Sequence, residues 1–262
     1  MDADLLALAE RAADRGSDVA VDTYRTTLSV ETKAHKNDVV SEADRAAQAR
    51  VIETLERESD APIVGEEEGA DSAVPERGRA WVVDPIDGTA NYLRGISLWA
   101  TSVAAVEDGE PVAAATVAPA LGESYLAADE GATLNGASMS VSERDDVETF
   151  AVAVLGWGPR DDRADYGRLA SEVVTRCGDM RRFGSMQLSL AYVASGALEA
   201  AITTRRPNPW DSMAGAHLVR AAGGRVTDLD GDRWRHDSDV LVASNGPKHD
   251  AVRAVARAAL TE

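Results

Sequence analysis

The sequence predicts a layered protein of α-helices and β-strands, and three observations support this fold class. Patterns with the helical period of 3.6 residues alternate along the chain with short apolar runs that are typical of strands. Turn residues separate these segments, and no internal repeat or low-complexity linker interrupts them. The 262 residues are enough to bury a sizeable core. Such an alternation indicates helices packed on the faces of sheets.

The first half should begin with two helices and continue into a sheet. Apolar residues at helical spacing predict the helices, the second with Ser41 as its N-cap. The turn Glu107-Asp108-Gly109-Glu110 predicts that the strands on either side of it pair as an antiparallel hairpin. We expect helices from the N-terminus to about residue 24 and at 41–58, and strands at 80–83, 98–106 and 112–118.

The second half repeats the mixture of helices and strands. We expect strands at 150–155, 200–202, 225–227 and 240–243, and helices at 165–177, 185–194, 211–222 and from 248. Gly196 and the pair Gly223-Gly224 should end two of the helices. A boundary near 140–150 divides the chain into parts 1–145 and 146–262, which we expect to form one continuous unit.

The composition excludes several classes of partner. A formal net charge of -18 and a sequence pI near 4.6 repel nucleic acids and anionic membranes. Because Lys33, Lys36 and Lys248 are the only lysines, we expect a halophilic source with a salt-rich cytoplasm, and high-GC coding bias is the alternative. A single cysteine, Cys177, allows no intramolecular disulfide, and the N-terminus lacks signal-peptide features, so we expect a cytoplasmic protein.

Three acidic motifs are candidates for metal chemistry. In Asp84-Pro85-Ile86-Asp87-Gly88-Thr89, two carboxylates at a strand end can converge on a hard cation, and the N–H groups of Gly88 and Thr89 can bind phosphate. The run 65–69 (GEEEG) follows an apolar segment, and Asp211 begins a predicted helix. Each motif also has a purely structural interpretation: 84–89 as a turn, 65–69 as a solvated loop and Asp211 as a helix N-cap.

The motifs together resemble the inositol monophosphatase family of Mg²⁺-dependent, lithium-sensitive sugar phosphatases. The resemblance spans nearly the whole chain, and its ordered blocks are more specific than any single block. These blocks are Lys33 with 38–44 (DVVSEAD), 65–67 (GEE), 84–92 (DPIDGTANY), 184–185 (GS), 191–196 (AYVASG), 210–215 (WDSMAG) and 223–224 (GG).

The resemblance implies a set of roles in the active site. Glu66, Asp84 and the carbonyl of Ile86 would hold one Mg²⁺, while Asp84, Asp87 and Asp211 would hold a second, with two or three ions in all. Glu66 and Thr89 would orient the attacking water, with Asp44 accepting a hydrogen bond from Thr89. Residues assigned to substrate are Lys33, Gly88, Thr89, Gly184, Ser185, Arg205 and Asp211. Oxygen-only ligands suit Mg²⁺ better than zinc.

The substrate is less constrained by the sequence. Thr204 lies where inositol-selective relatives often have an acidic residue. Nearby arginines, Arg181 with Arg182 and Arg205 with Arg206, are able to bind a second phosphate unless they simply balance surface acids. We therefore expect inositol 1-phosphate and also fructose 1,6-bisphosphate as substrates. The alternatives are fructose-1,6-bisphosphatase as the main role, 3'-phosphoadenosine 5'-phosphate phosphatase, and a non-catalytic partner of the transcription machinery.

Family resemblance also implies a layered αβαβα sandwich with mixed sheets, and a homodimer. The histidines His35, His217, His236 and His249 are scattered, so we interpret them as structural or surface residues and not as metal ligands. The segment 228–232 (DLDGD) has its glycine at the wrong position for a calcium loop, which favours a plain turn.

Overall fold

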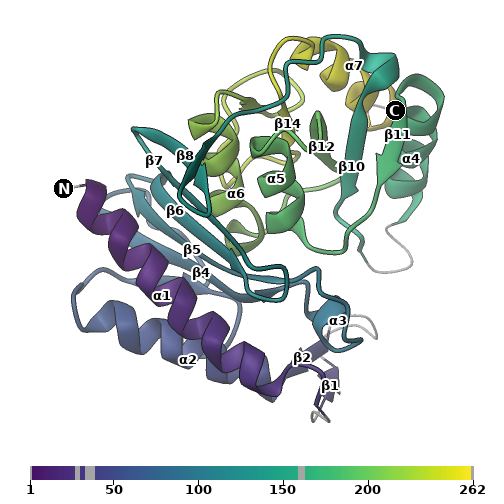
Figure 1. The fold of residues 1–262 in the computed structure, drawn as a ribbon. Helices are drawn as coiled ribbons and strands as arrows, with labels where there is room; N and C mark the ends of the chain where they lie inside the picture. Colours follow the sequence, from purple (N-terminus) through teal and green to yellow (C-terminus); the bar gives the residue numbers. More distant parts are fainter. Residues whose placement is uncertain (1, 27–29, 33–38, 159–162, 261–262) are drawn as a thin grey trace.

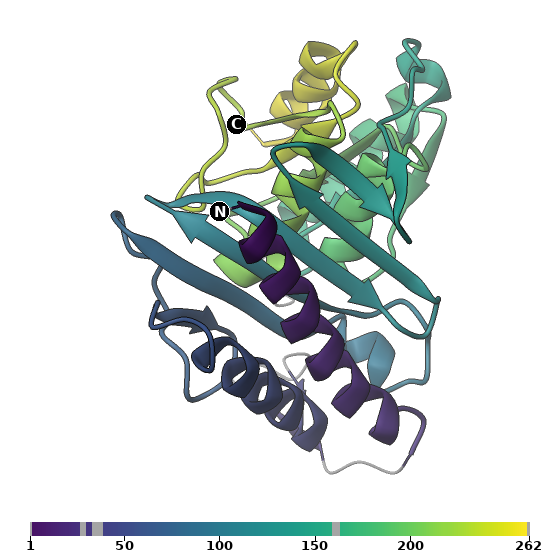
Figure 2. The same cartoon turned by 60° about the vertical axis from the view of Figure 1, so that its left-hand side comes forward.

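The computed structural model describes residues 2–26, 30–32, 39–158 and 163–260 (Figure 1). Within these ranges the chain forms a seven-stranded sheet, a five-stranded sheet and a two-stranded ribbon. Helices cover both outer faces and fill the space between the two large sheets (Figures 1 and 2). The expected layered αβαβα architecture is therefore confirmed.

The seven-stranded sheet is built from consecutive strands. Its order is β3-β4-β5-β6-β7-β8-β9, and every neighbouring pair is antiparallel except β3 and β4, which are parallel. The turn at Asp108-Gly109 joins β5 to β6 with both residues at positive φ, as a tight hairpin requires. The strands are β3 (Ile63–Gly65), β4 (Arg79–Asp87), β5 (Ala100–Glu107), β6 (Glu110–Ala118), β7 (Glu123–Ala128), β8 (Gly131–Leu134) and β9 (Ala137–Met139).

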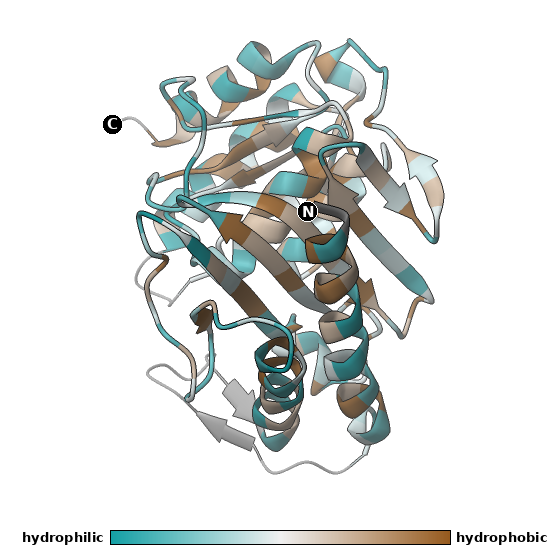
Figure 3. Cartoon of the chain, turned by 90° about the vertical axis from the view of Figure 1, so that its left-hand side faces the viewer, coloured by the Kyte–Doolittle hydropathy of each residue, from teal (hydrophilic) through white to brown (hydrophobic). Residues whose placement is uncertain are grey.

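Two helices, α1 (Asp2–Thr23) and α2 (Glu42–Glu56), cover the outer face of this sheet. The apolar strands beneath them are visible as brown segments in Figure 3. Alternate residues of β4 point to opposite sides, so Trp81 and Val83 pack under the two helices while Val82 belongs to the central core. The helices approach closely at Gly16, where a Cβ atom would lie 2.5 Å from a methyl group of Val51.

The five-stranded sheet has the order β11-β10-β12-β14-β13. Its strands are β10 (Ala151–Leu155), β11 (Asp179–Arg181), β12 (Ala200–Thr203), β13 (Arg225–Thr227) and β14 (Val242–Ser244). Strands β10, β11 and β12 are parallel, so their carboxyl ends meet at one edge, while β14 is antiparallel to both β12 and β13. Helices α4 (Arg163–Arg176) and α7 (His249–Leu260) cover its outer face.

The middle layer consists of α5 (Met186–Ala194) and α6 (Pro209–Ala221), which lie between the two large sheets (Figure 1). Their apolar side chains join the inner faces of both sheets in the largest hydrophobic cluster of the described residues. Because α5 and α6 contact both sheets, their first turns lie where the two halves of the chain meet.

The elements predicted from periodicity are present, with two differences. The segment Asp84-Pro85-Ile86-Asp87 is the end of β4 and not a turn that follows it. Seven strands, β1 (Val30–Thr32), β2 (Val39–Ser41), β3, β7, β8, β9 and β11, were not predicted. Five of these span only three residues, too few for an alternating pattern to show. None of the described helices combines the length and the apolar character that crossing a membrane requires.

Candidate metal centre

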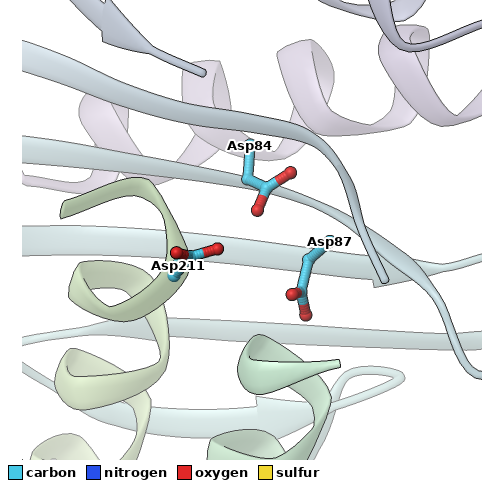
Figure 4. A group of neighbouring side chains, drawn as sticks. All are labelled: Asp84, Asp87 and Asp211. Atoms are coloured by element: carbon cyan, nitrogen blue, oxygen red, sulfur yellow. The ribbon is translucent and has the colours of Figure 1, made fainter. Parts of the chain in front are cut away.

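Three aspartates from distant parts of the chain meet at the boundary between the two halves. Asp84 and Asp87 lie on β4, and Asp211 lies in the first turn of α6. One carboxylate oxygen from each residue can be chosen so that all three atoms lie within 4.8 Å of one another. Figure 4 shows the three side chains pointing toward a common space. A single hard cation can contact oxygens at this spacing.

An irregularity in β4 places Asp84 and Asp87 on the same side. In a regular strand, residues three apart point to opposite faces. Here the pairing with β5 shifts between Asp84, opposite Ser102, and Asp87, opposite Ala100, so β4 has one extra residue. The backbone N–H of Ile86 donates to Asp84 Oδ1 at 3.1 Å, which fixes one oxygen of that carboxylate. The bulge is therefore the local feature that creates the site.

The first turn of α5 holds the carboxylate of Asp87. The hydroxyl of Ser185 and the backbone N–H of Gln187 donate to Asp87 Oδ2, the latter at 2.7 Å, and the N–H of Met186 donates to Oδ1 at 3.0 Å. Burial raises the pKa of Asp87 to about 6, and these hydrogen bonds limit the rise because they stabilise the charged form. A negative charge at a helix N-terminus is also favoured by the helix dipole.

Asp211 lies in a less favourable environment for a negative charge. Burial first, and then the charges of Glu66 and Asp87, raise the pKa of Asp211 to about 8. The side-chain amide of Asn208 donates to Asp211 Oδ2 at 2.9 Å, which partly offsets that effect. The mutual repulsion of these carboxylates requires a compensating positive charge if they are to be ionised together.

Asp84 lies at the centre of the repulsion. Burial raises its pKa well above the ordinary value, and the neighbouring carboxylates of Glu66, Asp87, Asp211 and Asp44 raise it further, in that order. Its Oδ2 atom is buried and has no hydrogen-bond partner among the described residues. A buried acceptor without a donor, surrounded by carboxylates, fits a divalent cation.

Glu66 follows β3 and lies near enough to raise the pKa values of both Asp84 and Asp211. The buried side chain of Gln48 fixes the backbone just after it: its amide donates to the carbonyls of Glu67 and Glu68, and its oxygen accepts the N–H of Glu67 at 3.0 Å. Helix α2 thus determines where the loop with Glu66 lies.

Thr89 and Asp44 are in contact, as the resemblance implied. The Thr89 hydroxyl lies 3.2 Å from Asp44 Oδ1 and 3.1 Å from the carbonyl oxygen of Ile86. Gly88 precedes Thr89 with φ of 94°, and a Cβ atom there would lie 2.9 Å from the carbonyl oxygen of Leu98. Glycine is therefore needed both for the backbone conformation and for the close approach of the 98 and 184 segments.

The remaining predicted site residues are only partly brought together. Gly184 and Ser185 lie beside Gly88, whereas Lys33 falls outside the described residues. Among the arginines, Arg181 pairs with Asp179, and Arg206 pairs with Asp239 at 2.7 Å. The guanidinium carbon of Arg182 lies 4.5 Å from the ring centre of Trp157, and Arg205 packs against Gly158. The four arginines thus do not form one cluster.

The histidines that the structure describes take no part in the carboxylate cluster. His249 lies between two hydroxyls, with Nε2 2.8 Å from Thr227 Oγ1 and Nδ1 2.7 Å from Ser244 Oγ, as a structural histidine would. In the 228–232 segment, the Asp228 carboxylate accepts the N–H groups of residues 230, 231 and 232 and closes a turn. His35 falls outside the described residues.

Three supporting residues were missed from the sequence. Gln48, Gln187 and Asn208 each hold the backbone or side chain of a residue in or beside the cluster. Asn208 stands three residues before Asp211, a spacing that allows contact at a helix start and was available as a signal. The side chains of Gln48 and Gln187 contact partners 19 to 28 residues away, which no local pattern reveals.

Comparison with known proteins connects this geometry with one group of proteins. Residues 1–261 match the inositol monophosphatase family. A fructose-1,6-bisphosphatase/inositol-1-monophosphatase of Thermotoga maritima is 35% identical over 236 residues, covering 89% of this chain and 88% of the relative. The solved structure of Thermotoga maritima IMPase TM1415 has a TM-score of 0.88 at 31% identity, and the match covers 100% of this chain and 99% of that one.

Other relatives have different names. Histidinol-phosphatase of Mycobacterium tuberculosis is 35% identical over 263 residues, with 96% and 97% of the two chains covered. Nus factor SuhB of Escherichia coli is 31% identical over 244 residues, with 92% and 91% covered. The relatives thus share the fold and length of this chain but not one named role.

Proposed function

Because the chain belongs to the inositol monophosphatase family, we propose that this phosphomonoesterase hydrolyses small sugar or polyol phosphates with Mg²⁺, and that inositol 1-phosphate is its main substrate. The observation that carries the proposal is the convergence of Asp84, Asp87 and Asp211, with Asp84 Oδ2 left without a hydrogen-bond donor among the described residues. The family is Mg²⁺-dependent, and an all-oxygen site suits that ion.

The ligand sets are those that the family resemblance implies. Glu66, Asp84 and the Ile86 carbonyl would hold one ion, and Asp84, Asp87 and Asp211 would hold another. We propose two or three Mg²⁺ ions in all. When bound, the ions neutralise the carboxylates, activate water and stabilise the leaving oxygen.

The chain's own residues place the nucleophile and the phosphate. Thr89 has one hydroxyl proton and two acceptors for it, Asp44 Oδ1 and the Ile86 carbonyl, so its oxygen remains able to accept a hydrogen bond from the attacking water. Glu66 would orient that water from the opposite segment and take up its proton. The N–H groups of Gly88 and Thr89 would hold a phosphate oxygen, with Gly184 and Ser185 alongside. Lys33 would add positive charge.

A second candidate activity, on fructose 1,6-bisphosphate, is favoured by the carboxyl edge of β10, β11 and β12. One aromatic or basic residue follows each of these parallel strands: Trp157 follows β10, Arg182 follows β11 and Arg205 follows β12. The site residues Ser185 and Asp211 come a few residues after β11 and β12, respectively. Ligands of α/β proteins commonly bind at such an edge. Arg182 stacks on Trp157 at this edge, three residues before Ser185, so its guanidinium is suited to a second phosphate.

A phosphate-release panel tests both candidates. It compares inositol 1-phosphate, fructose 1,6-bisphosphate, histidinol phosphate and 3'-phosphoadenosine 5'-phosphate, each with Mg²⁺ and with EDTA. Arg182→Ala and Arg205→Ala should lower kcat/KM for the bisphosphate by about tenfold or more relative to inositol 1-phosphate, since a phosphate contact by arginine is a charge-assisted hydrogen bond. Arg181→Ala, whose side chain pairs with Asp179, is the matched control. Preference for histidinol phosphate would reject the proposed substrate.

The cluster also argues against a purely non-catalytic partner of the transcription machinery. A chain used only for binding has no need to keep four mutually repelling carboxylates, Glu66, Asp84, Asp87 and Asp211, around one space. Pull-down with RNA polymerase, run beside the phosphate-release panel, separates the two roles. Binding to polymerase with no phosphate release from any substrate would reject the enzyme proposal.

We further propose a homodimer in a salt-rich cytoplasm. The net charge of -18 supports the second part, because screening in strong salt relieves repulsion between surface carboxylates. The melting temperature should rise steadily up to molar KCl, and a flat dependence would reject the salt adaptation. Light scattering during size-exclusion chromatography at the same KCl concentrations tests the dimer.

A further inference from the structure

A single buried side chain, that of Gln187, connects α5 to α6 beside the carboxylate cluster. Its amide nitrogen donates to the carbonyl oxygen of Trp210 at 2.5 Å, and its amide oxygen accepts the backbone N–H of Gly215 at 2.7 Å. Gln187 is fully buried and both of its polar groups are paired. These two bonds fix the first turns of α6 against α5.

The backbone of the same residue contacts the cluster directly. The N–H of Gln187 donates to Asp87 Oδ2 at 2.7 Å, while Trp210, held by the side chain, immediately precedes Asp211. One residue therefore touches Asp87 through its main chain and the segment of Asp211 through its side chain. Asp87 belongs to β4 of the first half of the chain, and Asp211 belongs to the second half.

Close packing makes this connection stiff. A Cβ atom on Gly215 would lie 2.5 Å from Leu190 Cβ and 2.9 Å from Gln187 Oε1, so α5 and α6 are in contact along this side. A shift of α6 along α5 would break both amide hydrogen bonds and leave the buried polar groups of the Gln187 side chain unpaired, which is costly. The distance between the carboxylates of Asp87 and Asp211 is thus tied to the Gln187 side chain.

We propose that Gln187 is a positioning residue that holds Asp211 in place relative to Asp87, so that both carboxylates can bind the same Mg²⁺. The inference rests on one part of the proposed function, namely that the carboxylate cluster is the Mg²⁺ site. Residues that orient metal ligands from outside the coordination shell commonly change metal affinity by 10- to 100-fold. An ion held by Glu66, Asp84 and the Ile86 carbonyl would not depend on this connection.

The test measures Mg²⁺ binding by titration calorimetry on the full chain. Gln187→Met keeps the length of the side chain and removes both hydrogen bonds, and Gln187→Ala leaves room for water at Trp210 and Gly215 if the methionine variant does not fold. Asn245→Leu is the matched control, because Asn245 is a buried amide that donates to the carbonyls of Ser142 and Arg144 and makes no hydrogen bond to the cluster within the described part of the chain.

We expect one class of Mg²⁺ sites in the Gln187 variant to weaken by about tenfold or more while the other is unchanged. The Mg²⁺ concentration for half-maximal phosphate release should rise by the same factor, with kcat at saturating Mg²⁺ within about threefold of the wild type. Affinity within twofold of the wild type, or equal weakening in Asn245→Leu, would overturn the inference. A wild-type protein that binds no Mg²⁺ would instead reject the proposed function.

Discussion

Replacing Asp211 by asparagine should make the metal-free protein more stable, although it removes a residue of the proposed active site. The pKa of Asp211 is raised from 3.8 to about 8 in the folded protein. The folded state therefore binds this proton more tightly than the unfolded chain, so the contribution of Asp211 to stability is fully present below pH 3.8 and is lost as the pH rises toward 8. Asparagine carries no charge at any pH and avoids this loss.

The size of the effect follows from the same shift. At pH 7 the solution is about 3 pH units above the pKa of Asp211 in the unfolded chain, while the folded protein still keeps the proton. Each pH unit changes the free energy of unfolding by about 1.4 kcal/mol, so the ionisation of Asp211 in the unfolded chain costs the folded state about 4 kcal/mol of stability. Because Asp211 titrates together with Asp84 and Asp87, part of this free energy is shared, and we expect Asp211→Asn to gain about 2–4 kcal/mol. For a chain of this length that is a rise of roughly 4–8 °C in melting temperature.

The assay is a calorimetric scan at pH 7 and constant KCl, in EDTA and in Mg²⁺. In EDTA the variant should melt above the wild type. With Mg²⁺ the wild type should gain stability, by about 2.7 kcal/mol at a hundredfold excess over Kd, and the variant should gain much less. Asp228→Asn is the control, because its carboxylate accepts three backbone N–H groups away from the cluster. A variant that melts below the wild type in EDTA would refute the electrostatic reasoning.

Three further outcomes are expected. Thr89→Val should lower kcat by about 10²- to 10⁴-fold because it removes a hydroxyl next to Asp44, with Mg²⁺ affinity unchanged by calorimetry; a kcat near that of the wild type would contradict its role. Asn208→Ala should raise the Mg²⁺ concentration for half-maximal activity by about tenfold, since it removes the 2.9 Å hydrogen bond to Asp211, and an unchanged Mg²⁺ dependence would exclude that role. Burial lowers the pKa of His217 from 6.5 to about 4, so its neutral form stabilises the fold above pH 6.5 and this contribution is lost as the pH falls toward 4. In urea unfolding with Mg²⁺, His217→Gln should therefore reduce the stability lost between pH 7.5 and 5 by about 2 kcal/mol, and an equal loss in both proteins would disprove it.

The sequence predicts those parts of the fold that are encoded locally. The apolar stripes of α1 and α2 and the turn at Asp108-Gly109 are short-range patterns, and the structure confirms the elements that they indicate. By contrast, β8 and β9 are short, and they are defined by their pairing with neighbours rather than by their own composition. Which strands share a sheet likewise depends on contacts that no single segment contains.

The same division applies to the site. The acidic motifs could be recognised because their order and spacing are specific, and the structure brings Asp84, Asp87 and Asp211 together. The β4 bulge was not predicted, because the motif was interpreted as a turn. The hydrogen bonds from Gln187 and the first turn of α5 to Asp87 depend on how α5 packs against β4. Such partners follow from tertiary structure alone.

The construction of the cluster links metal binding to the assembly of the two halves. Asp84 and Asp87 lie in the first half of the chain, whereas Asp211 and the donors to Asp87 lie in the second. Without a cation, the buried carboxylates repel one another across this boundary, while the hydrogen bonds to Asp87 hold it closed. A divalent cation held by Asp84, Asp87 and Asp211 would convert that repulsion into attraction between the two halves. The residues proposed for catalysis therefore also determine how strongly the two halves hold together, and Mg²⁺ should protect amides of α6 and β4 from hydrogen exchange together.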